Sequence, residues 1–415
     1  MNMIITTHSK QPLQIDRFKV LRLLAKGGFG LVYHVKDMQG SKEEYALKLL
    51  HNSLHIKRIN DQLNVLKLLN TSELFLKTYL SKRVLDRFFI LFEYAVEGDL
   101  KKLVGENPLS ESMACGILMQ LLDSLAFLKE NTIIHGDIKA ENILKKGSHF
   151  YLSDWDIIKK GPSCKAIHLQ GDDDFSAPEI YEGSYHYASD IYSLGCTLYF
   201  MLSGAHIYGL SSEDDFSKKM FAHLYFTQLP HAAISKKMVY LINRMTEKDH
   251  TARATIQEIR EILNSTSVYE LKARENGIRD NFSTKFERYL YMAQNDVAYA
   301  QNIVGLLYEE GKLVQQDFSK AIYWYQKAAA KGILKAVFNL ALAYKVAKGT
   351  QKDYKKAMEL FMACADENHS RSFYNIGDMY ENGLGVKRDR NAAFTFYKKA
   401  AYNGYEPAYK KLKQF

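Results

Sequence analysis

Short runs of alternating apolar and polar residues mark the first part of the chain. Three of them, "RFKVLRLLA", "GLVYHVKD" and "EYALKLL" within residues 17–50, are rich in β-prone residues and are separated by glycines and charged turns, as strands are. A helical pattern follows over 57–69, apolar strands come around 79–94, and the chain is mostly helical from 110 onward. Residues 18–264 therefore predict a small sheet followed by a larger helical lobe.

From about residue 296 onward the pattern is helical throughout, and it repeats every 36 residues. Four sets of equivalent positions keep this register: Ala300, Ala336, Ser372 and Ala408; Tyr308, Tyr344 and Tyr380; Asp317, Asp353 and Asp389; Ala321, Ala357 and Ala393. Each unit contains two amphipathic helices whose apolar faces are buried only when units stack. The pattern predicts an all-α solenoid over 296–415, with repeats at 297–332, 333–368 and 369–404 and a C-terminal cap.

The stretch between these two parts, residues 265–295, is charged and polar. It has a helical texture in "SVYELKAREN" and "TKFERYLYMA", so we expect a linker or bridging helices there.

Composition excludes several classes of protein. Of 415 residues, 47% are hydrophobic and 25% charged, which is typical of a soluble globular protein. The net charge of +9 comes from scattered lysines at helical spacing, which favours solvated helix faces over a nucleic-acid interface. The four cysteines contain no CxxC pair, and this spacing favours a reducing compartment over a zinc site or a disulfide framework.

No membrane span is expected from the sequence. The N-terminal "MNMIITTHSKQPLQ" lacks the apolar stretch of a signal peptide. The most membrane-like segment, residues 191–210, is interrupted by serine, glycine and histidine, so it predicts a buried core helix.

Candidate chemistry begins with a glycine-rich turn, "LLAKGGFGLV", between two predicted strands. Its glycines leave room for a backbone to fold over phosphates, although three glycines alone are weak evidence. Lys48 follows in the apolar strand "YALK". A buried lysine is costly without an anion, and a bound phosphate would supply one.

Residues 133–156, "IIHGDIKAENILKKGSHFYLSDWD", bring together polar residues at intervals that suit a nucleotide and its metal ions. With this stretch, residues 18–264 resemble the eukaryotic-type protein kinase domain. The matching motifs occur in the family's order: "AKGGFGLV", "YALK", "HGDIKAEN", "SDWD", "APE", "SDIYSLG" and "TARATIQEI". Several motifs in order are far more specific than any one of them. The expected fold is α+β, a two-lobed protein-kinase-like domain followed by an all-α repeat solenoid.

The resemblance implies a role for each matching residue. Lys48 would hold the ATP phosphates under a loop formed by Gly27, Gly28, Phe29 and Gly30. Asp137 would accept the proton of the substrate hydroxyl, Lys139 would steady the γ-phosphate, and Asn142 and Asp154 would hold Mg²⁺. The implied adenosine contacts are the backbone of Glu93 and Ala95 next to the gatekeeper Phe92, Asp99 near the ribose, and Leu24, Val32, Ala46 and Leu144 around the base. Glu179 and Arg253 resemble the family's buried structural ion pair.

Several positions depart from the family's pattern. Gln62 stands where a helical glutamate usually pairs with the lysine, so it could accept a hydrogen bond from Lys48 without neutralising it. Gly136 replaces an arginine that binds a phosphorylated activation loop in many kinases, and Asp172, Asp173 and Asp174 would repel added phosphate. We therefore predict no requirement for activation-loop phosphorylation. Trp155 should fill the usual phenylalanine slot, and Asp156 replaces a glycine.

Substrate specificity and activity leave alternatives open. Lys139 is typical of serine/threonine kinases, whereas "QGDDDFSAPE" has some likeness to Wee-type kinases, which phosphorylate tyrosine. The main hypothesis is an ATP- and Mg²⁺-dependent serine/threonine kinase. Gln62 and "DWD" motivate a second one, a pseudokinase scaffold that binds nucleotide and partners without catalysis. A small-molecule kinase of related fold is a third, and the region from "APE" to "TARATIQEI" argues against it.

The repeats resemble the Sel-one-like repeat, a relative of the tetratricopeptide repeat, through "KAxxWYxKAAxxG" in the second helix. That family implies protein–protein scaffolding, so we expect a protein substrate and a protein partner on the solenoid. The alternative is an array that only supports the first domain. The expected localisation is cytoplasmic, and the pairing of the two families suggests a bacterial protein delivered into a host cell.

Overall fold

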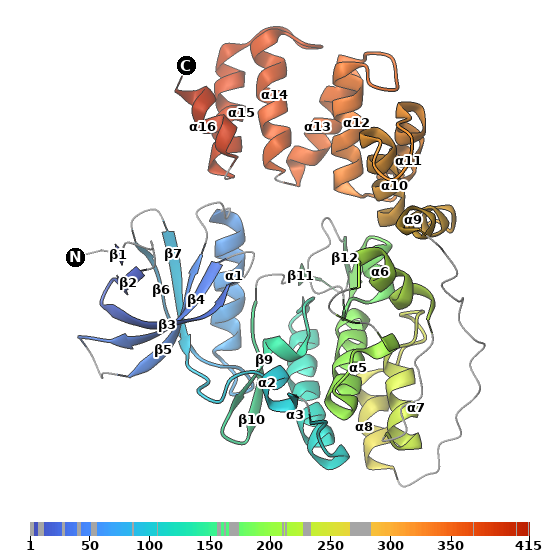
Figure 1. The fold of residues 1–415 in the computed structure, drawn as a ribbon. Coiled ribbons are helices and arrows are strands. Elements are labelled where there is room, and N and C mark those ends of the chain that lie inside the picture. The colour runs from blue at the N-terminus through green and yellow to red at the C-terminus, as the bar shows by residue number, and fades with distance from the viewer. Residues whose placement is uncertain are drawn as a thin grey trace. The chain divides into compact units, whose positions relative to one another are not determined.

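The structure is a computed structural model of the 415-residue chain. It describes all residues except 1–3, 7–11, 27–29, 40–42, 51–55, 85–86, 106, 156–158, 162, 166–173, 210, 212–213, 227–233, 266–283, 368, 404 and 414. The chain forms two compact units (Figure 1). The first contains residues 1–103, 141–156 and 402–404, and the second contains 104–140, 157–401 and 405–415. The division falls within the predicted kinase-like region, so the lobes are described separately.

The first unit is built on an antiparallel sheet with the strand order β1-β2-β3-β4-β5-β7-β6. Its strands are β1 (Ile4–Thr6), β2 (Pro12–Ile15), β3 (Phe18–Lys26), β4 (Gly30–Asp37), β5 (Glu44–Leu50), β6 (Thr78–Val84) and β7 (Arg87–Glu93). Helix α1 (Ile56–Leu69) contacts β6, and the hairpin of β9 (Ile143–Lys146) and β10 (His149–Leu152) completes the unit. The predicted sheet and helix are confirmed, whereas β1 and β2 were too short to recognise.

One face of this sheet carries the apolar core of the unit. Alternate residues of neighbouring strands, including Tyr33, Val35, Leu47, Leu49 and Leu91, are buried there in one cluster. Because side chains alternate along a strand, the residues between them lie on the other face.

The second unit begins with the helical lobe, in which α5 is the central helix. Its elements are α2 (Leu100–Val104, shared with the first unit), α3 (Glu111–Glu130), β8 (Ile133–Ile134), η1 (Ala140–Asn142), β11 (Lys159–Lys160), β12 (Ser163–Lys165), α4 (Pro178–Tyr181), β13 (Ser184–His186), α5 (Tyr187–Ser203), η2 (Ile207–Gly209), α6 (Phe216–Tyr225), α7 (Lys236–Met245) and α8 (Ile256–Asn264). Helix α5 is buried from Ser189 to Leu202 and contacts α3 and α7. A Cβ on Gly195 would lie 2.8 Å from that of Met245, so glycine is needed for this close packing.

The burial of α5 explains the apolar segment 191–210, because a helix that is apolar all round is a core helix. Among the described residues, only α3 has the length and apolarity of a membrane-crossing helix, and α3 packs against α5 and α8.

The rest of the second unit is helical, as the repeat pattern predicts. Helix α9 (Lys285–Gln294) is followed by the pairs α10 (Ala298–Glu310) and α11 (Phe318–Ala330), α12 (Leu334–Val346) and α13 (Tyr354–Asp366), and α14 (Ser370–Asn382) and α15 (Arg390–Tyr402), and then by α16 (Glu406–Leu412). Equivalent helices begin 36 residues apart. Helix α9 covers "KFERYLYMA" and ends one residue beyond it, whereas "SVYELKAREN" lies entirely outside the described residues.

Small residues permit the helices of a repeat to pack closely. A Cβ on Gly305 would lie 2.7 Å from the ring of Tyr325, and one on Gly377 would lie 2.8 Å from the ring of Tyr397. In both repeats the tyrosine hydroxyl donates to a glutamate of the first helix, Glu309 at 2.6 Å and Glu381 at 2.7 Å. The 36-residue register of the sequence thus corresponds to an interhelical contact that recurs in these repeats. The α+β fold class and the all-α array are confirmed.

Candidate active site

The expected site residues are divided between the two units, and each half is described within its own unit. Gly27, Gly28 and Phe29 of the glycine-rich turn, and Asp156, lie outside the described residues. Gly30 begins β4, and a Cβ there would come within 2.5 Å of the Leu49 carbonyl oxygen. This glycine is therefore required by the close approach of β4 to β5, in addition to any role beside a phosphate.

Two of the residues expected around the base, Val32 and Ala46, share with Lys48 the sheet face opposite the apolar core. Lys48 lies opposite Val32 in the β4–β5 register, and Ala46 lies opposite Phe92 in the β5–β7 register. Directly opposed residues point to the same face, as do residues two apart on one strand. Leu24 lies on the neighbouring strand β3, at a register irregularity beside Val32. The sheet thus places Val32, Ala46 and Lys48 on one surface.

Lys48 and Asp154 form an ion pair on this side of the first unit. Lys48 Nζ lies 2.6 Å from Asp154 Oδ1. The lysine side chain is 9% exposed and the aspartate side chain 38% exposed. A carboxylate partner offsets the cost of burying the ammonium group. Asp154 has a φ of +63°, a left-handed conformation that costs a non-glycine residue roughly 1–3 kcal/mol and is common at functional sites.

The β9–β10 hairpin brings Asn142 near Asp154. Ser153 donates to the Asn142 carbonyl oxygen from its backbone N–H at 2.8 Å and from Oγ at 3.0 Å. Asn142 and Asp154 therefore lie at the open end of one hairpin. Their amide and carboxylate oxygens are the hard ligands that Mg²⁺ prefers. In the described part of the chain no group of three or more histidine, cysteine or acidic residues is placed so that it could hold a metal ion, and Mg²⁺ typically uses one or two carboxylates plus phosphate oxygens and water. The donor set fits that ion.

The last residue of β7, Glu93, is hydrogen-bonded to Lys77, which precedes β6, and to Lys146 of β9. The Glu93 N–H donates to the Lys77 carbonyl oxygen at 2.8 Å, and the Glu93 carboxylate accepts from Lys146 and from the Lys77 N–H. Burial raises the pKa of Glu93, but these hydrogen bonds and the Lys146 charge outweigh it and hold the pKa below its ordinary value. Ala95 is buried.

Asp99 is brought beside Leu144 by an isolated antiparallel bridge. This contact places the residue expected near the ribose next to one expected against the base. The Asp99 carboxylate also accepts from the Lys102 N–H at 2.9 Å and from Lys102 Nζ at 2.7 Å. Asp99 therefore caps α2 as well, a structural role that the sequence did not reveal.

The catalytic-loop half lies in the second unit. Asp137 is buried, and its Oδ2 lies 3.3 Å from Lys139 Nζ. The Asp137 N–H donates to His135 Nδ1 at 3.3 Å, and His135 is itself buried. A carboxylate and an ammonium group are thus held side by side, one suited to accept a proton and the other to neutralise a phosphate.

Comparison with known proteins decides the family. The family model "Protein kinase domain" matches residues 18–264, more than half of the chain. The chain belongs to the protein kinase family. Three Sel1 repeats, the Sel-one-like repeats expected above, match residues 298–333, 334–368 and 372–405. A kinase domain binds ATP and in general uses a divalent metal ion.

Curated relatives match the kinase domain at low identity. The chain is 29% identical over 206 residues to probable serine/threonine-protein kinase zyg-1 of Caenorhabditis briggsae, which covers 47% of this chain and 28% of the relative. It is 28% identical over 244 residues to calcium-dependent protein kinase 4 of Plasmodium falciparum, and this alignment covers 55% of the chain and 46% of the relative. It is 29% identical over 203 residues to serine/threonine-protein kinase PLK4 of Drosophila virilis, and this alignment covers 46% of the chain and 26% of the relative. The chain thus spans between about a quarter and half of the length of these relatives.

Asp190 of the kinase domain is a positioning residue that the sequence analysis missed. Its carboxylate accepts from the backbone N–H of His135 at 2.9 Å and from that of Gly136 at 2.8 Å. Burial raises the pKa of Asp190 above its ordinary value. The available signal was an aspartate at the start of the otherwise apolar "DIYSLGCTLYFML". Gly136 has a φ of +78°, so glycine removes backbone strain that the usual arginine would carry.

The expected ion pair between Glu179 and Arg253 is confirmed. Arg253 Nη1 lies 2.7 Å from Glu179 Oε1, and Nη2 lies 3.0 Å from Oε2. Burial raises the pKa of Glu179, but the hydrogen bonds and charge of Arg253 outweigh it and hold the pKa below its ordinary value. Trp155 is buried as expected and packs edge-to-face on Phe75, with ring centroids 5.5 Å apart.

The kinase-domain structure bears on two expectations, the one for Asp172–Asp174 and the one for Gln62. Asp174 is buried and pairs with Lys219 at 2.8 Å, so its charge is neutralised and does not repel phosphate; Asp172 and Asp173 lie outside the described residues. Gln62 lies on α1, the helix where the family's glutamate is expected, and is buried.

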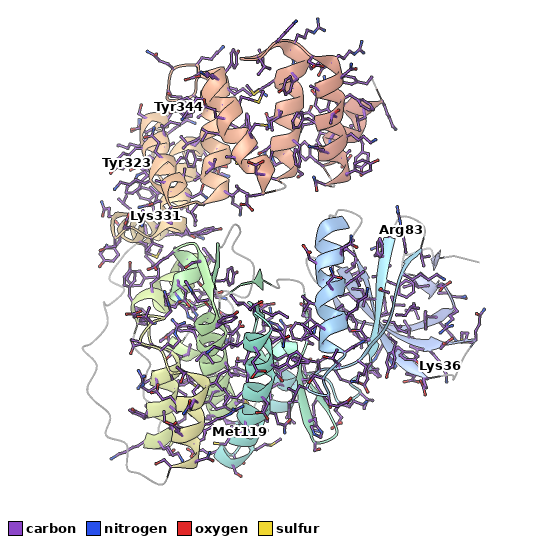
Figure 2. The ribbon with its side chains drawn as sticks, turned by 180° about the vertical axis from the view of Figure 1, so that it is seen from behind. Lys36, Arg83, Met119, Tyr323, Lys331 and Tyr344 are labelled. Carbon is purple, nitrogen blue, oxygen red and sulfur yellow. The ribbon has the colours of Figure 1, made fainter. Side chains whose placement is uncertain are left out.

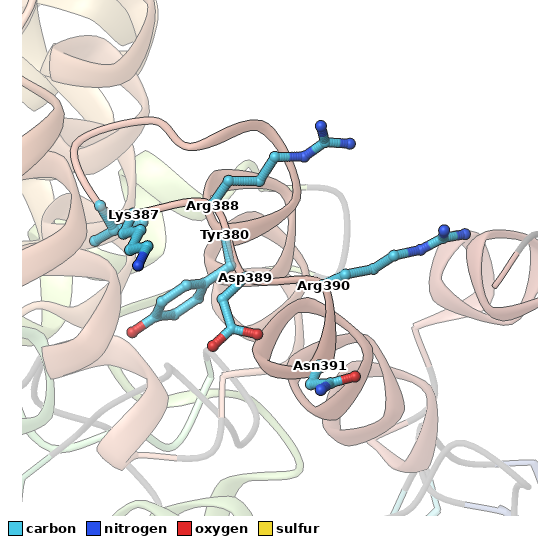
Figure 3. A pocket seen from close by; sticks show the side chains of 7 residues that line it. Tyr380, Lys387, Arg388, Asp389, Arg390 and Asn391 are labelled. Carbon is cyan, nitrogen blue, oxygen red and sulfur yellow. The ribbon is translucent and has the colours of Figure 1, made fainter.

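A hollow on the third repeat is separate from the kinase-domain site. It is lined by Tyr380, Val386, Lys387, Arg388, Asp389, Arg390 and Asn391 between α14 and α15 (Figure 3). The equivalent positions of the first two repeats hold Gln315, Gln316 and Phe318, and Gln351, Lys352 and Tyr354. At these three positions the third repeat, with Lys387, Arg388 and Arg390, is therefore the most basic of the three.

Proposed function

We propose that the chain is an ATP- and Mg²⁺-dependent kinase that transfers the γ-phosphate to serine or threonine of a protein substrate. The observation that carries the proposal is the ion pair of Lys48 with Asp154, which holds both charged groups on the sheet face that also bears Val32 and Ala46. The catalytic-loop pair, Asp137 and Lys139, supports it from the second unit.

Each residue would contribute positioning or charge. Lys48 would bind phosphate oxygens, and Asn142 and Asp154 would hold Mg²⁺, which when bound neutralises charge that develops on the phosphate oxygens. The Asp137 carboxylate would accept the proton of the substrate hydroxyl as its oxygen bonds to phosphorus and the bond to the leaving ADP oxygen breaks. Lys139 Nζ would stabilise the transferred group. Preorganised charges of this kind are a large catalytic term because they need no reorganisation during the reaction.

Serine/threonine specificity is supported by Lys139 and by the similarity to zyg-1 and PLK4, which are named as serine/threonine-protein kinases. Tyrosine specificity remains the alternative that "QGDDDFSAPE" motivates, and the first four residues of that stretch, 170–173, lie outside the described residues.

A pseudokinase scaffold is the second candidate, because Gln62 carries no charge to pair with Lys48. In that case the ion pair of Lys48 with Asp154 would be a resting arrangement that binds nucleotide without transferring phosphate.

The test is transfer from γ-labelled ATP by the purified full chain to a protein extract, with Mg²⁺, followed by acid hydrolysis of the products. We expect labelled phosphoserine and phosphothreonine, and none with Asp137→Asn. Phosphotyrosine alone would overturn the specificity. ATP binding with no label above Asp137→Asn would establish the scaffold instead.

The repeat array is proposed to recruit a protein substrate or partner. The third-repeat hollow supports this, because Lys387, Arg388 and Arg390 form no ion pair within the described part of the chain, which suits a partner with an acidic segment. A cytoplasmic protein, delivered by a bacterium into a host cell, is the proposed setting, and a translocation assay tests it.

A further inference from the structure

Helices α4 and α6 of the kinase domain bury apolar side chains against the repeat part of the chain. Tyr181, Met220 and Phe221 belong to one buried cluster with residues of α9 and α10. The α9 and α10 residues of this cluster that are most completely buried are Met292, Ala293, Ala298, Ala300 and Val304. These three residues of the kinase domain's helical lobe therefore share one apolar core with α9 and the first repeat, although residues 266–283 lie outside the described part.

Aromatic rings form the centre of this contact. Tyr291 of α9 meets two rings of α6, with its centroid 5.9 Å from Phe221 and 5.8 Å from Tyr225. Tyr299 of α10 lies 5.8 Å from Phe216, the first residue of α6. Rings at these separations and steep angles contribute more than their buried area alone.

Charged groups close one edge of the contact. Asp215 is the N-cap of α6, and its carboxylate faces two cations from the first turn of α9. Arg288 Nη1 lies 3.6 Å from Asp215 Oδ2 and donates to Ser217 Oγ at 3.0 Å, and Lys285 Nζ lies 3.9 Å from Asp215 Oδ1. The arginine thus binds the same turn of α6 through a charge and a hydrogen bond.

A second edge is formed by the turn between α11 and α12. A Cβ on Gly183, which follows α4, would lie 3.5 Å from Ile333 Cδ1 and 3.8 Å from the Lys331 carbonyl oxygen. Lys331, labelled in Figure 2, also pairs with Asp296 at 2.6 Å. Contacts from α9, α10 and this turn together cover the α4–α6 face.

We infer that the α4–α6 face is a built-in docking surface whose partner is the chain's own repeat array, with α9 as the docking helix. The array is held by this surface. A partner bound to the second or third repeat is then presented in a fixed orientation to the lobe that carries Asp137. This last consequence rests on the proposed function, whereas the docking itself does not.

The test uses the full chain with a protease site placed within residues 266–283 and cut after purification. We expect the two pieces to co-elute as one species in size-exclusion chromatography at micromolar concentration. Tyr291→Asp places a carboxylate between two α6 rings and should weaken the association at least tenfold, so that the pieces separate. The matched control is Tyr323→Asp at an exposed tyrosine of α11 (Figure 2), which should leave them together.

Two results would overturn the inference. One is separation of the cut wild-type pieces, and the other is retention of the cut Tyr291→Asp chain as tightly as the Tyr323→Asp chain. Circular dichroism of the uncut variants checks that the helices remain folded. If Tyr291→Asp does not fold, Arg288→Glu decides by the same criterion, because it places like charges beside Asp215. Elution needs no catalysis, so failure of this inference and failure of the proposed kinase activity are distinguishable.

Discussion

In the ion pair between Glu179 and Arg253 the two side chains are 2% and 0% exposed, whereas in the pair between Lys48 and Asp154 the carboxylate is 38% exposed. Arg253 makes two contacts to Glu179 and three to backbone carbonyl oxygens, and Ser189 donates to Glu179. Asp154 has a left-handed backbone. The Glu179–Arg253 pair is thus fully enclosed, as suits a structural contact, whereas the pair expected to serve ligands has an accessible member with a strained backbone.

This contrast predicts that changes at the accessible pair affect phosphate transfer most. Lys48→Met removes a positioned charge, so we expect the rate of transfer to fall by roughly 10²–10³-fold, as for other preorganised stabilising groups. The free energy of unfolding should change less than in any Glu179 or Arg253 variant. Transfer assays and denaturant titrations of the same preparation measure both. The contrast would be contradicted if Lys48→Met lowered the free energy of unfolding as much as the Arg253 variants do and left the rate of transfer nearly unchanged.

The enclosed pair should respond in the opposite way. Arg253→Met leaves the Glu179 carboxylate buried without its cation, so we expect a loss of about 3–5 kcal/mol in the free energy of unfolding. Thermal and chemical unfolding of the full chain test this, with Arg260→Met as the control, since Arg260 makes an exposed pair with Asp123 at 2.6 Å worth about 0–1 kcal/mol. Equal effects of the two variants would contradict the expectation.

Acid should weaken the enclosed pair selectively. The pKa of Glu179 is lowered by Arg253 despite the opposing effect of burial, so its stabilisation is present above the ordinary value of 4.5 and is lost as the pH falls through the folded-state pKa. Asp190 has a raised pKa, owing to burial, and acts in the opposite sense. We expect a fall in unfolding free energy below pH 4.5 that is smaller in Arg253→Met. An unchanged acid dependence in that variant would show that other groups cause it.

Gly136 offers a smaller test at the catalytic loop. Its φ of +78° penalises a side chain by roughly 1–2 kcal/mol, so Gly136→Ala should lose about that much stability. Gly116→Ala is the matched control, because a Cβ at that α3 glycine meets no atom within 4 Å, and it should not destabilise the chain. Equal unfolding midpoints for the two variants would contradict the strain argument.

Gln62→Glu is expected to have the smallest effect. A carboxylate at this buried position of α1 would restore the family's usual charge for Lys48, and we expect transfer to rise by less than about tenfold, equivalent to under 1.4 kcal/mol. Gln120→Glu on α3 is the matched control, because it makes the same amide-to-carboxylate change away from Lys48. A complete loss of transfer in Gln62→Glu would contradict this expectation.

Local patterns in the sequence predicted most of the fold. The 36-residue repeat predicted the helices of the array because each repeat carries the same interhelical contacts, such as those of Tyr325 and Tyr397. Ordered motifs predicted the ion pair of Glu179 and Arg253 across 74 residues only through resemblance to a family. The roles assigned to the nucleotide-site residues remain predictions, and three of those residues lie outside the described part.

Contacts between distant segments could not be predicted from local patterns. Asp190 binds backbone N–H groups 54 and 55 residues earlier, and no local periodicity marks that pairing. The docking of Tyr291 on α6 could not be predicted for the same reason. An aromatic residue in a helical pattern indicates a buried position, but it does not indicate which element it packs against. Asp174 was misjudged for this reason, since its cation, Lys219, lies on another element.

The most direct measurement of the central claim is transfer of γ-phosphate to protein serine or threonine by the full chain and by Asp137→Asn, with unfolding midpoints taken on the same samples. The account predicts that the variant loses roughly 10²–10⁴-fold in rate, as expected for removal of a general base, while both proteins remain folded. Equal, background-level transfer by two folded proteins would contradict it.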